Sequence, residues 1–116
     1  MLVINEKNAH RIKISGGELR TLISSKIADV KNIQMGTLEL QPGNRVPEGS
    51  KLSSHEAEEF SYIIQGKLRV WSEGKELVLE EGDCIFNAPG NKHWCRAEGD
   101  LPVKLVWVLS PPDNSI

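Results

Sequence analysis

Two histidines and one glutamate are the residues of this chain whose types and spacing could support metal chemistry. His55 and Glu59 are four positions apart, and His93 follows the turn pair Pro89-Gly90. If the first stretch is extended, residues of the same parity share a face, so the side chains of His55 and Glu59 point the same way. Two imidazoles and one carboxylate suit Zn, Fe, Mn, Ni or Cu and leave positions open for a substrate.

A simpler interpretation of these three residues competes with the metal hypothesis. An isolated histidine usually lies at the surface or is satisfied in the core, and two histidines with a glutamate can occur together by coincidence. A purely structural or interaction module is nevertheless disfavoured. Buried His and Glu side chains without a partner cost stability.

Length and charge limit the function classes. The chain has 116 residues, 26% of them charged, and a formal net charge of −2. This predicts one soluble domain, and the absence of a basic patch or a long apolar run predicts no nucleic-acid and no membrane partner. The polar stretch Asn5 to Asn8 is unlike a signal peptide, so we expect a cytoplasmic protein whose two cysteines stay reduced.

Short β-strands separated by turn signals must position the candidate residues. The segment 19–30 fits either one helical face or a strand followed by a loop, and 43–54 is a polar loop. Strands that recur about every 8–12 residues, with Gly and Pro turns between them, favour an all-β sandwich or closed barrel. The expected strands cover residues 36–41, 60–65, 68–72, 76–79, 84–87, 93–97 and 103–109.

Two sequence motifs resemble those of the cupin superfamily. The run His55 to Gly66 resembles the first cupin motif, with Glu59 at the glutamate position, and Gly82 to His93 is similar to the second. The resemblance covers residues 36–109 and is closest to small single-domain cupins of the cupin_2 type. It implies a double-stranded β-helix, the jelly-roll barrel. It also makes His55, Glu59 and His93 three of the four usual metal ligands.

The chain departs from the family pattern at the fourth ligand. The first histidine of the His-x-His pair falls on Ser53, and the asparagine that often follows the second-motif histidine is Ala97. The Pro and Gly of the second motif are adjacent. The resemblance therefore implies either a three-ligand divalent metal site (Zn, Fe, Mn or Ni) or a metal-free pocket, with Ser53 and Cys95 as further pocket residues.

A finer resemblance links the chain to the sensor domains at the C-terminus of some helix-turn-helix regulators. It rests on residues 55–68 and on Val106 to Pro112. Those domains bind small effectors. This chain has no room for a helix-turn-helix, so the resemblance implies a stand-alone pocket.

The cysteines and tryptophans leave alternatives open. If the Pro89-Gly90 turn is symmetric, Cys84 faces Cys95 across a hairpin, and the two could form a disulfide. Cys95 could instead be a substitute ligand, but two small buried side chains are the favoured interpretation. The three tryptophans are expected to pack in the core, or to line the pocket or a dimer interface; they are Trp71, Trp94 and Trp107.

The sequence thus predicts a single cupin domain over residues 1–116, with the barrel core at 36–109 and N-terminal strands within 1–35. One hypothesis is a protein that binds a small polar or carboxylated molecule in the barrel interior, with or without a divalent metal. The alternative is a metal-dependent enzyme, such as a dioxygenase, decarboxylase or isomerase, acting on a small substrate. The small core and the resemblance favour a homodimer.

Overall fold

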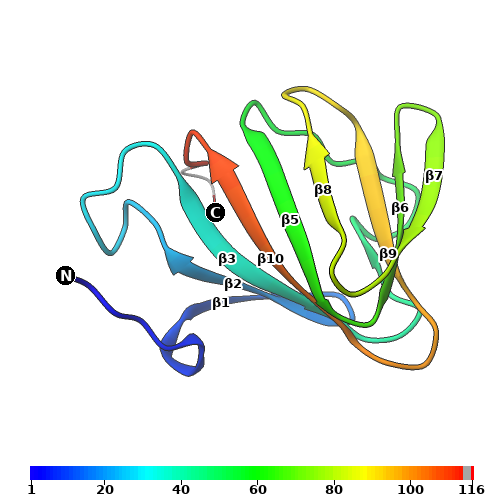
Figure 1. Cartoon of the computed structure of the whole chain (residues 1–116), viewed down its shortest axis with the longest axis horizontal. Helices are drawn as coiled ribbons and strands as arrows, with labels where there is room; N and C mark the ends of the chain where they lie inside the picture. Colours follow the sequence, from blue (N-terminus) through cyan, green and yellow to red (C-terminus); the bar gives the residue numbers. More distant parts are fainter. Residues whose placement is uncertain (114–115) are drawn as a thin grey trace.

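Two facing antiparallel β-sheets form the body of the protein in the computed structural model, which describes residues 1–113 and 116 (Figure 1). A 3-10 turn, η1 (Glu6–Asn8), precedes them. The six-stranded sheet has the order β1 (His10–Ile14), β2 (Gly17–Ile23), β3 (Gln34–Leu40), β10 (Val103–Ser110), β5 (Glu58–Gln65) and β8 (Cys84–Asn87). The four-stranded sheet has the order β4 (Arg45–Val46), β9 (His93–Glu98), β6 (Lys67–Ser72) and β7 (Lys75–Leu79).

This arrangement confirms the predicted all-β fold of the jelly-roll type, in which the chain crosses repeatedly between the two sheets from β3 to β10. The expected strands match β3 and β5 to β10 to within two residues at each end. Segment 19–30 proves to be a strand followed by a loop, because β2 ends at Ile23. The polar loop 43–54 contains the short strand β4. In the part of the chain that the structure describes, no helix has the length and apolarity to cross a bilayer.

The core lies between the sheets and follows the two-residue period of the strands. Along β10, buried residues alternate strictly with partly exposed ones, as expected when one face of an antiparallel sheet packs inward. Leu40 and Val103 are almost completely buried on the six-stranded sheet, and Leu68 is buried opposite them on the four-stranded sheet. The same alternation determines which side chains face the interior site.

Gly36 in β3 allows the inner face of the sheet to accept an indole ring. A Cβ atom at this position would lie 2.0 Å from the backbone oxygen of Arg20 and 2.3 Å from Cζ2 of Trp107. Both distances are far shorter than a van der Waals contact. The Trp107 ring can therefore occupy its place beside β3 only because residue 36 has no side chain.

The predicted hairpin between strands 84–87 and 93–97 is wrong. β8 pairs with β5 in the six-stranded sheet, whereas β9 pairs with β6 and β4 in the other sheet. The Pro89-Gly90 turn instead carries the chain from one sheet to the other. The amide of Gly90 donates a hydrogen bond of 2.7 Å to the carbonyl of His55, so this turn fixes a neighbouring loop rather than closing a hairpin.

Candidate metal centre and interior cavity

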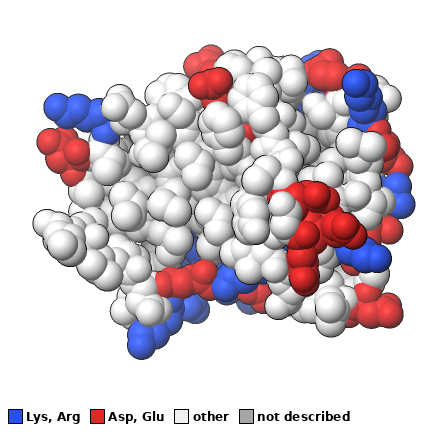
Figure 2. All heavy atoms as spheres, viewed as in Figure 1, with Lys and Arg blue, Asp and Glu red and all other residues white. Residues whose placement is uncertain are grey.

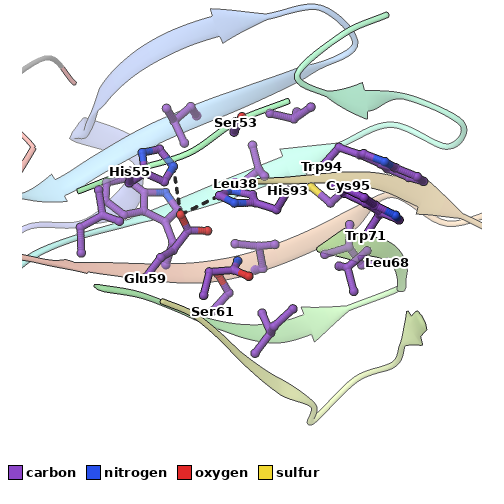
Figure 3. Close-up of a pocket in the computed structure, with 18 of the residues that line it drawn as sticks. Leu38, Ser53, His55, Glu59, Ser61, Leu68, Trp71, His93, Trp94 and Cys95 are labelled. Carbon is purple, nitrogen blue, oxygen red and sulfur yellow. Dashed lines mark ion pairs between the residues drawn. The ribbon is translucent and has the colours of Figure 1, made fainter. Parts of the chain in front are cut away.

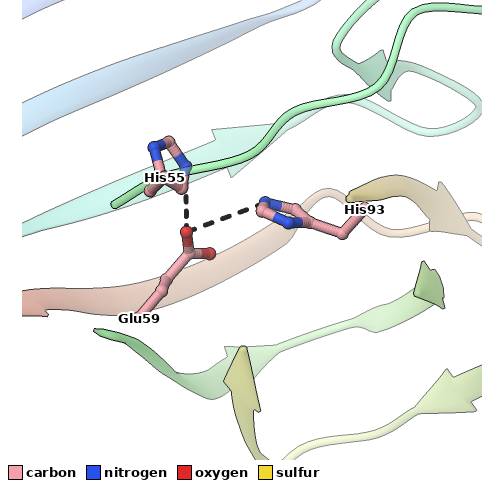
Figure 4. A group of neighbouring side chains, drawn as sticks. All are labelled: His55, Glu59 and His93. Atoms are coloured by element: carbon pink, nitrogen blue, oxygen red, sulfur yellow. Dashed lines mark ion pairs between the residues drawn. The ribbon is translucent and has the colours of Figure 1, made fainter. Parts of the chain in front are cut away.

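Three separate segments bring His55, Glu59 and His93 together (Figure 4). His55 lies in the loop before β5, Glu59 is in β5, and His93 begins β9. The Nε2 atoms of His55 and His93 lie 3.0 and 3.7 Å from Oε2 of Glu59. One donor atom from each residue falls within 4.8 Å of the others. This set of two imidazole nitrogens and one carboxylate oxygen has the composition and the spacing that a divalent transition metal needs.

Backbone hydrogen bonds hold the His55 loop against the start of β9. Ser53 and His93 form an antiparallel bridge, in which each amide donates to the other's carbonyl at 2.8 and 2.9 Å. Together with the bond from Gly90 to His55, this bridge fixes both histidines relative to one another. Main-chain bonds therefore hold the loop before β5 to β9 and to the Pro89-Gly90 turn.

The electrostatics of the triad centre on Glu59. Burial by itself would raise the pKa of the Glu59 carboxyl, but the hydrogen bond with His55 and the nearby charge of His93 outweigh it, and the pKa lies below its ordinary value. A hydrogen bond with the Asn87 side chain acts in the same direction. The hydrogen bond with Glu59 raises the pKa of His55 against the opposing effect of burial. Glu59 is thus an anion that holds positive charge next to it.

The groups that contact Nδ1 of each histidine hold its Nε2 atom toward Glu59. Nδ1 of His93 donates a 3.0 Å hydrogen bond to the carbonyl of Asn91, and Nδ1 of His55 faces the Asp113 carboxylate at 3.9 Å. Partners of this kind orient metal-binding histidines and select their tautomer. The sequence analysis missed them, together with Asn87, because their positions depend on turns and on strand pairing.

A cavity of about 190 Å³ lies between the two sheets and has the triad on its wall (Figure 3). Most of its lining is apolar, with Leu38 from one sheet and Leu68 from the other. The polar side chains of Ser61 and Asn87 lie on the same side as Glu59, on β5 and β8. The cavity thus combines apolar walls with one polar, charged region.

Both pocket residues expected from the sequence, Ser53 and Cys95, line this cavity. Ser53 occupies the position of the missing family histidine and adjoins His93 through the backbone bridge. Burial raises the pKa of the Cys95 thiol to about 12, so the thiol is protonated at neutral pH. Among the described residues, the group able to hold a metal contains the triad and not Cys95.

The two cysteines lie in different environments and are both free thiols. Cys95 is partly buried and faces the cavity, whereas Cys84 is exposed on the outer face of β8. The proposed cross-strand disulfide and the buried position of Cys84 are therefore both wrong. The reason is that β8 and β9 belong to different sheets.

All three tryptophans line the cavity, as one of the expected alternatives had it, and Trp107 is also buried in the hydrophobic core, as another had it. Trp71 and Trp94 oppose each other in the four-stranded sheet, and the guanidinium of Arg45 stacks 4.8 Å above the Trp94 ring. The indole N–H of Trp107 is buried without a hydrogen-bond partner among the described residues. A buried donor of this kind is available to a ligand oxygen.

Comparison with known proteins agrees with this fold. Residues 36–109 match the family model described as "Cupin domain". The chain is 30% identical over 96 residues to the tetracenomycin polyketide synthase protein TcmJ of Streptomyces glaucescens, covering 83% of this chain and 62% of that protein. It is 29% identical to polyketide synthase CurC of Streptomyces cyaneus, covering 94% of this chain and 69% of that one. The chain thus spans only about two thirds of the length of these relatives.

The fold also matches a solved structure over almost its whole length. The structure of KdgF from Halomonas sp. superimposes with a TM-score of 0.82 at 14% identity, covering 99% of this chain and 97% of that one. At this identity the likeness concerns the fold alone. The family-model match over residues 36–109, together with the two-sheet jelly roll, shows that the chain belongs to the cupin family.

Proposed function

We propose that this protein binds a divalent metal ion through His55, Glu59 and His93 and uses the site to hold a small oxygenated molecule in the barrel interior. The observation that carries the proposal is the approach of three donor atoms to within 4.8 Å of one another on the wall of a cavity. Zn, Fe, Mn and Ni all accept this ligand set. When bound, the ion would act as a Lewis acid toward a ligand oxygen.

The cavity supports a compact ligand with an apolar body and a polar end. A cavity of about 150 Å³ is enough to take up a benzene ring, and this cavity is about 190 Å³. Its leucine and tryptophan walls would contact the apolar body, while the triad would receive a carboxylate, keto or enol oxygen. The unpartnered indole N–H of Trp107 could donate to a second oxygen. We therefore propose a ligand of about one ring with oxygen substituents.

The names of the relatives point to the same ligand chemistry. TcmJ and CurC are both described as polyketide synthase proteins, and polyketides are rich in keto and enol oxygens on carbon rings. We extend to this chain only the class of ligand, an oxygenated ring compound. The sequence predicted a small polar or carboxylated ligand, and the proposal restricts this class to ligands that also have an apolar body.

Catalysis is the second candidate function. Three protein ligands leave coordination positions open, as in catalytic rather than purely structural sites. In an enzyme, the Glu59 carboxylate could accept a proton from the ligand, because it lies on the wall of the cavity. A dioxygenase, decarboxylase or isomerase acting on the same oxygenated ligand would fit this arrangement.

We also propose that residues 1–116 work as a single cupin domain in the cytoplasm, with the N-terminal strands of residues 1–35 extending the 36–109 core. β1 and β2 pair with β3 in one continuous sheet, which supports a single unit. Separate expression of residues 36–109 should then yield a poorly folded protein. A stable, cooperatively folded fragment would argue against the proposal.

Metal analysis of the purified protein tests the site. We expect close to one equivalent of metal after loading with Zn, Mn, Fe or Ni in turn, and its loss in His55→Ala and His93→Ala. His10→Ala is the matched control, because His10 is exposed in β1 and remote from the triad. Retention of metal by both triad variants, or no metal under any loading condition, would contradict the proposal.

A ligand screen separates binding from catalysis. Oxygenated ring compounds that raise the melting temperature of the metal-loaded protein, but not of His93→Ala, would identify the ligand class. A binding protein returns the compound unchanged, whereas an enzyme converts it, and mass spectrometry of the recovered compound distinguishes the two. Stabilisation only by fully apolar compounds would contradict the proposed polar end.

A further inference from the structure

A second cavity lies at the end of the molecule where the N-terminal segment, the end of β2 and the loop after β2 come together (Figure 1). Its volume is about 320 Å³, which is enough for a compact organic molecule, since a cavity of about 150 Å³ takes up a benzene ring. Among the residues that the structure describes, it shares one lining residue, Ile116, with the interior cavity. None of the triad residues lines it, so a ligand held here would not depend on the metal site.

Thr21 brings a buried hydroxyl to the lining of this second cavity. The residue lies in β2 and is only 5% exposed, and its Oγ1 atom has no hydrogen-bond partner among the described residues. Buried polar side chains nearly always have such a partner. The Thr21 hydroxyl is therefore a group that a ligand in the cavity can satisfy.

The turn after β2 adds a second hydroxyl and a positive charge to the same lining. The carbonyl of Ser24 accepts hydrogen bonds of 3.1 Å from the amides of Ile27 and Ala28. Its Oγ atom accepts a 3.3 Å hydrogen bond from the amide of Lys26, so its own hydrogen can still be donated. These bonds fix the turn, in which both Ser24 and Lys26 line the cavity.

The charge around this cavity favours an anion. No acidic side chain lines it in the part of the chain that the structure describes. The carboxylate of Glu6, in the N-terminal segment, pairs with Lys104 and Arg20 instead. Figure 2 shows mostly uncharged surface at this end of the molecule, with charged side chains at its margins. The positive charge of Lys26 is thus not balanced by an acidic group in the lining.

We propose that the second cavity binds a small organic carboxylate. The hydroxyls of Thr21 and Ser24 would donate hydrogen bonds to the carboxylate, and Lys26 would supply the opposite charge. A single lysine matches a singly charged carboxylate better than a phosphate group, which carries nearly two charges at neutral pH. The apolar part of the ligand would contact the aliphatic side chains of the lining, which include Ile4, Leu22 and Ile27.

Binding of benzoate to the metal-free protein tests this site. Wild type in the presence of a chelator and the His93→Ala variant both lack the proposed metal site, so benzoate should bind saturably to both. It should shift the backbone amide NMR signals of Thr21, Ser24 and Lys26. Benzamide, which has the same shape without the charge, should bind at least about fivefold more weakly. Acetate, which lacks the ring, should bind at least about tenfold more weakly.

Two substitutions separate the ligand contacts from folding. Thr21→Val keeps the shape of the side chain and removes the hydroxyl, so it should weaken benzoate binding about fivefold without lowering the melting temperature of the free protein. Lys26→Ala should weaken binding about tenfold. Lys31→Ala is the matched control and should bind like wild type, because Lys31 is an exposed lysine of the same loop that does not line the cavity.

Three results would overturn the proposal. Benzoate could leave the signals of Thr21, Ser24 and Lys26 unmoved, benzamide could bind as tightly as benzoate, or both substitutions could leave the affinity unchanged. A failure of the metal site would appear in the metal analysis instead and would leave benzoate binding as it is. The two sites are therefore tested independently.

Discussion

Among the individual residues, Glu59 determines the charge of the site. It accepts hydrogen bonds from His55 and Asn87, and His93 adds a nearby positive charge when protonated. Its side chain is only 17% exposed, so little water competes with these contacts. A largely buried carboxylate with such partners stabilises the fold, and that stabilisation decreases when His55 loses its proton or when Glu59 gains one.

The stability of the metal-free protein should depend on pH because of this coupling between Glu59 and His55. Because the pKa of His55 is raised in the folded protein, its contribution to stability is complete below about pH 6.5 and is lost as the pH rises through the raised value. Because the pKa of Glu59 is lowered in the folded protein, its contribution to stability is present above about pH 4.5 and is lost as the pH falls through the lowered value. Glu59→Gln should therefore lower the free energy of unfolding by roughly 1 kcal/mol, and this loss should be largest near pH 5–6.

Urea unfolding in the presence of a chelator measures this effect. The stability gap between wild type and Glu59→Gln should narrow as the pH rises to about 9. Glu58→Gln is the control, because Glu58 is the exposed neighbour on the outward side of the same strand. A gap that stays constant over the whole pH range would mean that the His55 contact does not contribute in solution.

Cys95 should be chemically inert in the folded protein. Its thiol pKa of about 12, raised by burial, leaves almost no thiolate at pH 8. In a Cys84→Ser variant, the remaining cysteine should react with iodoacetamide only after urea is added, as detected by mass spectrometry. Rapid alkylation of the native variant would show instead that the cavity wall opens readily around this residue.

Among the strands, β3 has the strictest steric requirement. Gly36→Ala would push a methyl group against the Arg20 carbonyl and the Trp107 ring. Because a backbone oxygen cannot rotate away, we expect a loss of about 3 kcal/mol in the free energy of unfolding. Displacement of the Trp107 ring should also change the indole fluorescence of the folded state.

Gly43→Ala provides the comparison for this substitution. Gly43 has a φ of +81° but nothing within 4 Å of a new Cβ, so only the backbone strain of about 1 kcal/mol is expected. Denaturant midpoints of the two variants separate the steric cost from the conformational one. Equal losses would show that the indole and the β2 backbone move aside without cost.

For the molecule as a whole, the site links the two sheets. Glu59 belongs to the six-stranded sheet, His93 to the four-stranded sheet, and His55 to the loop between them. A metal bound to all three would bind the folded state and not the unfolded chain. At 100 times its dissociation constant it would add about 2.7 kcal/mol of stability.

We therefore expect metal loading to raise the melting temperature by about 10 °C, given the usual sensitivity of domains of this size. A chelator should reverse the shift. His93→Ala should show no shift, and His10→Ala should show the full one. Equal shifts in wild type and His93→Ala would indicate that the metal binds elsewhere on the protein.

The local pattern of the sequence was enough to predict the strands and the candidate triad. Alternating apolar residues and Gly or Pro turns locate strands because both depend on neighbouring residues only. The four-residue spacing of His55 and Glu59, and the motif around His93, pointed to three side chains that the fold does bring together. The positions of Ser53 and Cys95 on the cavity wall followed from the same motif positions and strand parity.

Only the tertiary structure decided which strands pair and therefore what surrounds the triad. The sequence around Pro89-Gly90 is compatible with a hairpin, and nothing local reveals that β8 and β9 separate into different sheets. That choice depends on burial over the whole chain. It exposes Cys84, brings Asn87 to Glu59 and places Asp113 behind His55. The candidate ligands could thus be found from local spacing, whereas the residues that surround them depend on contacts between distant segments.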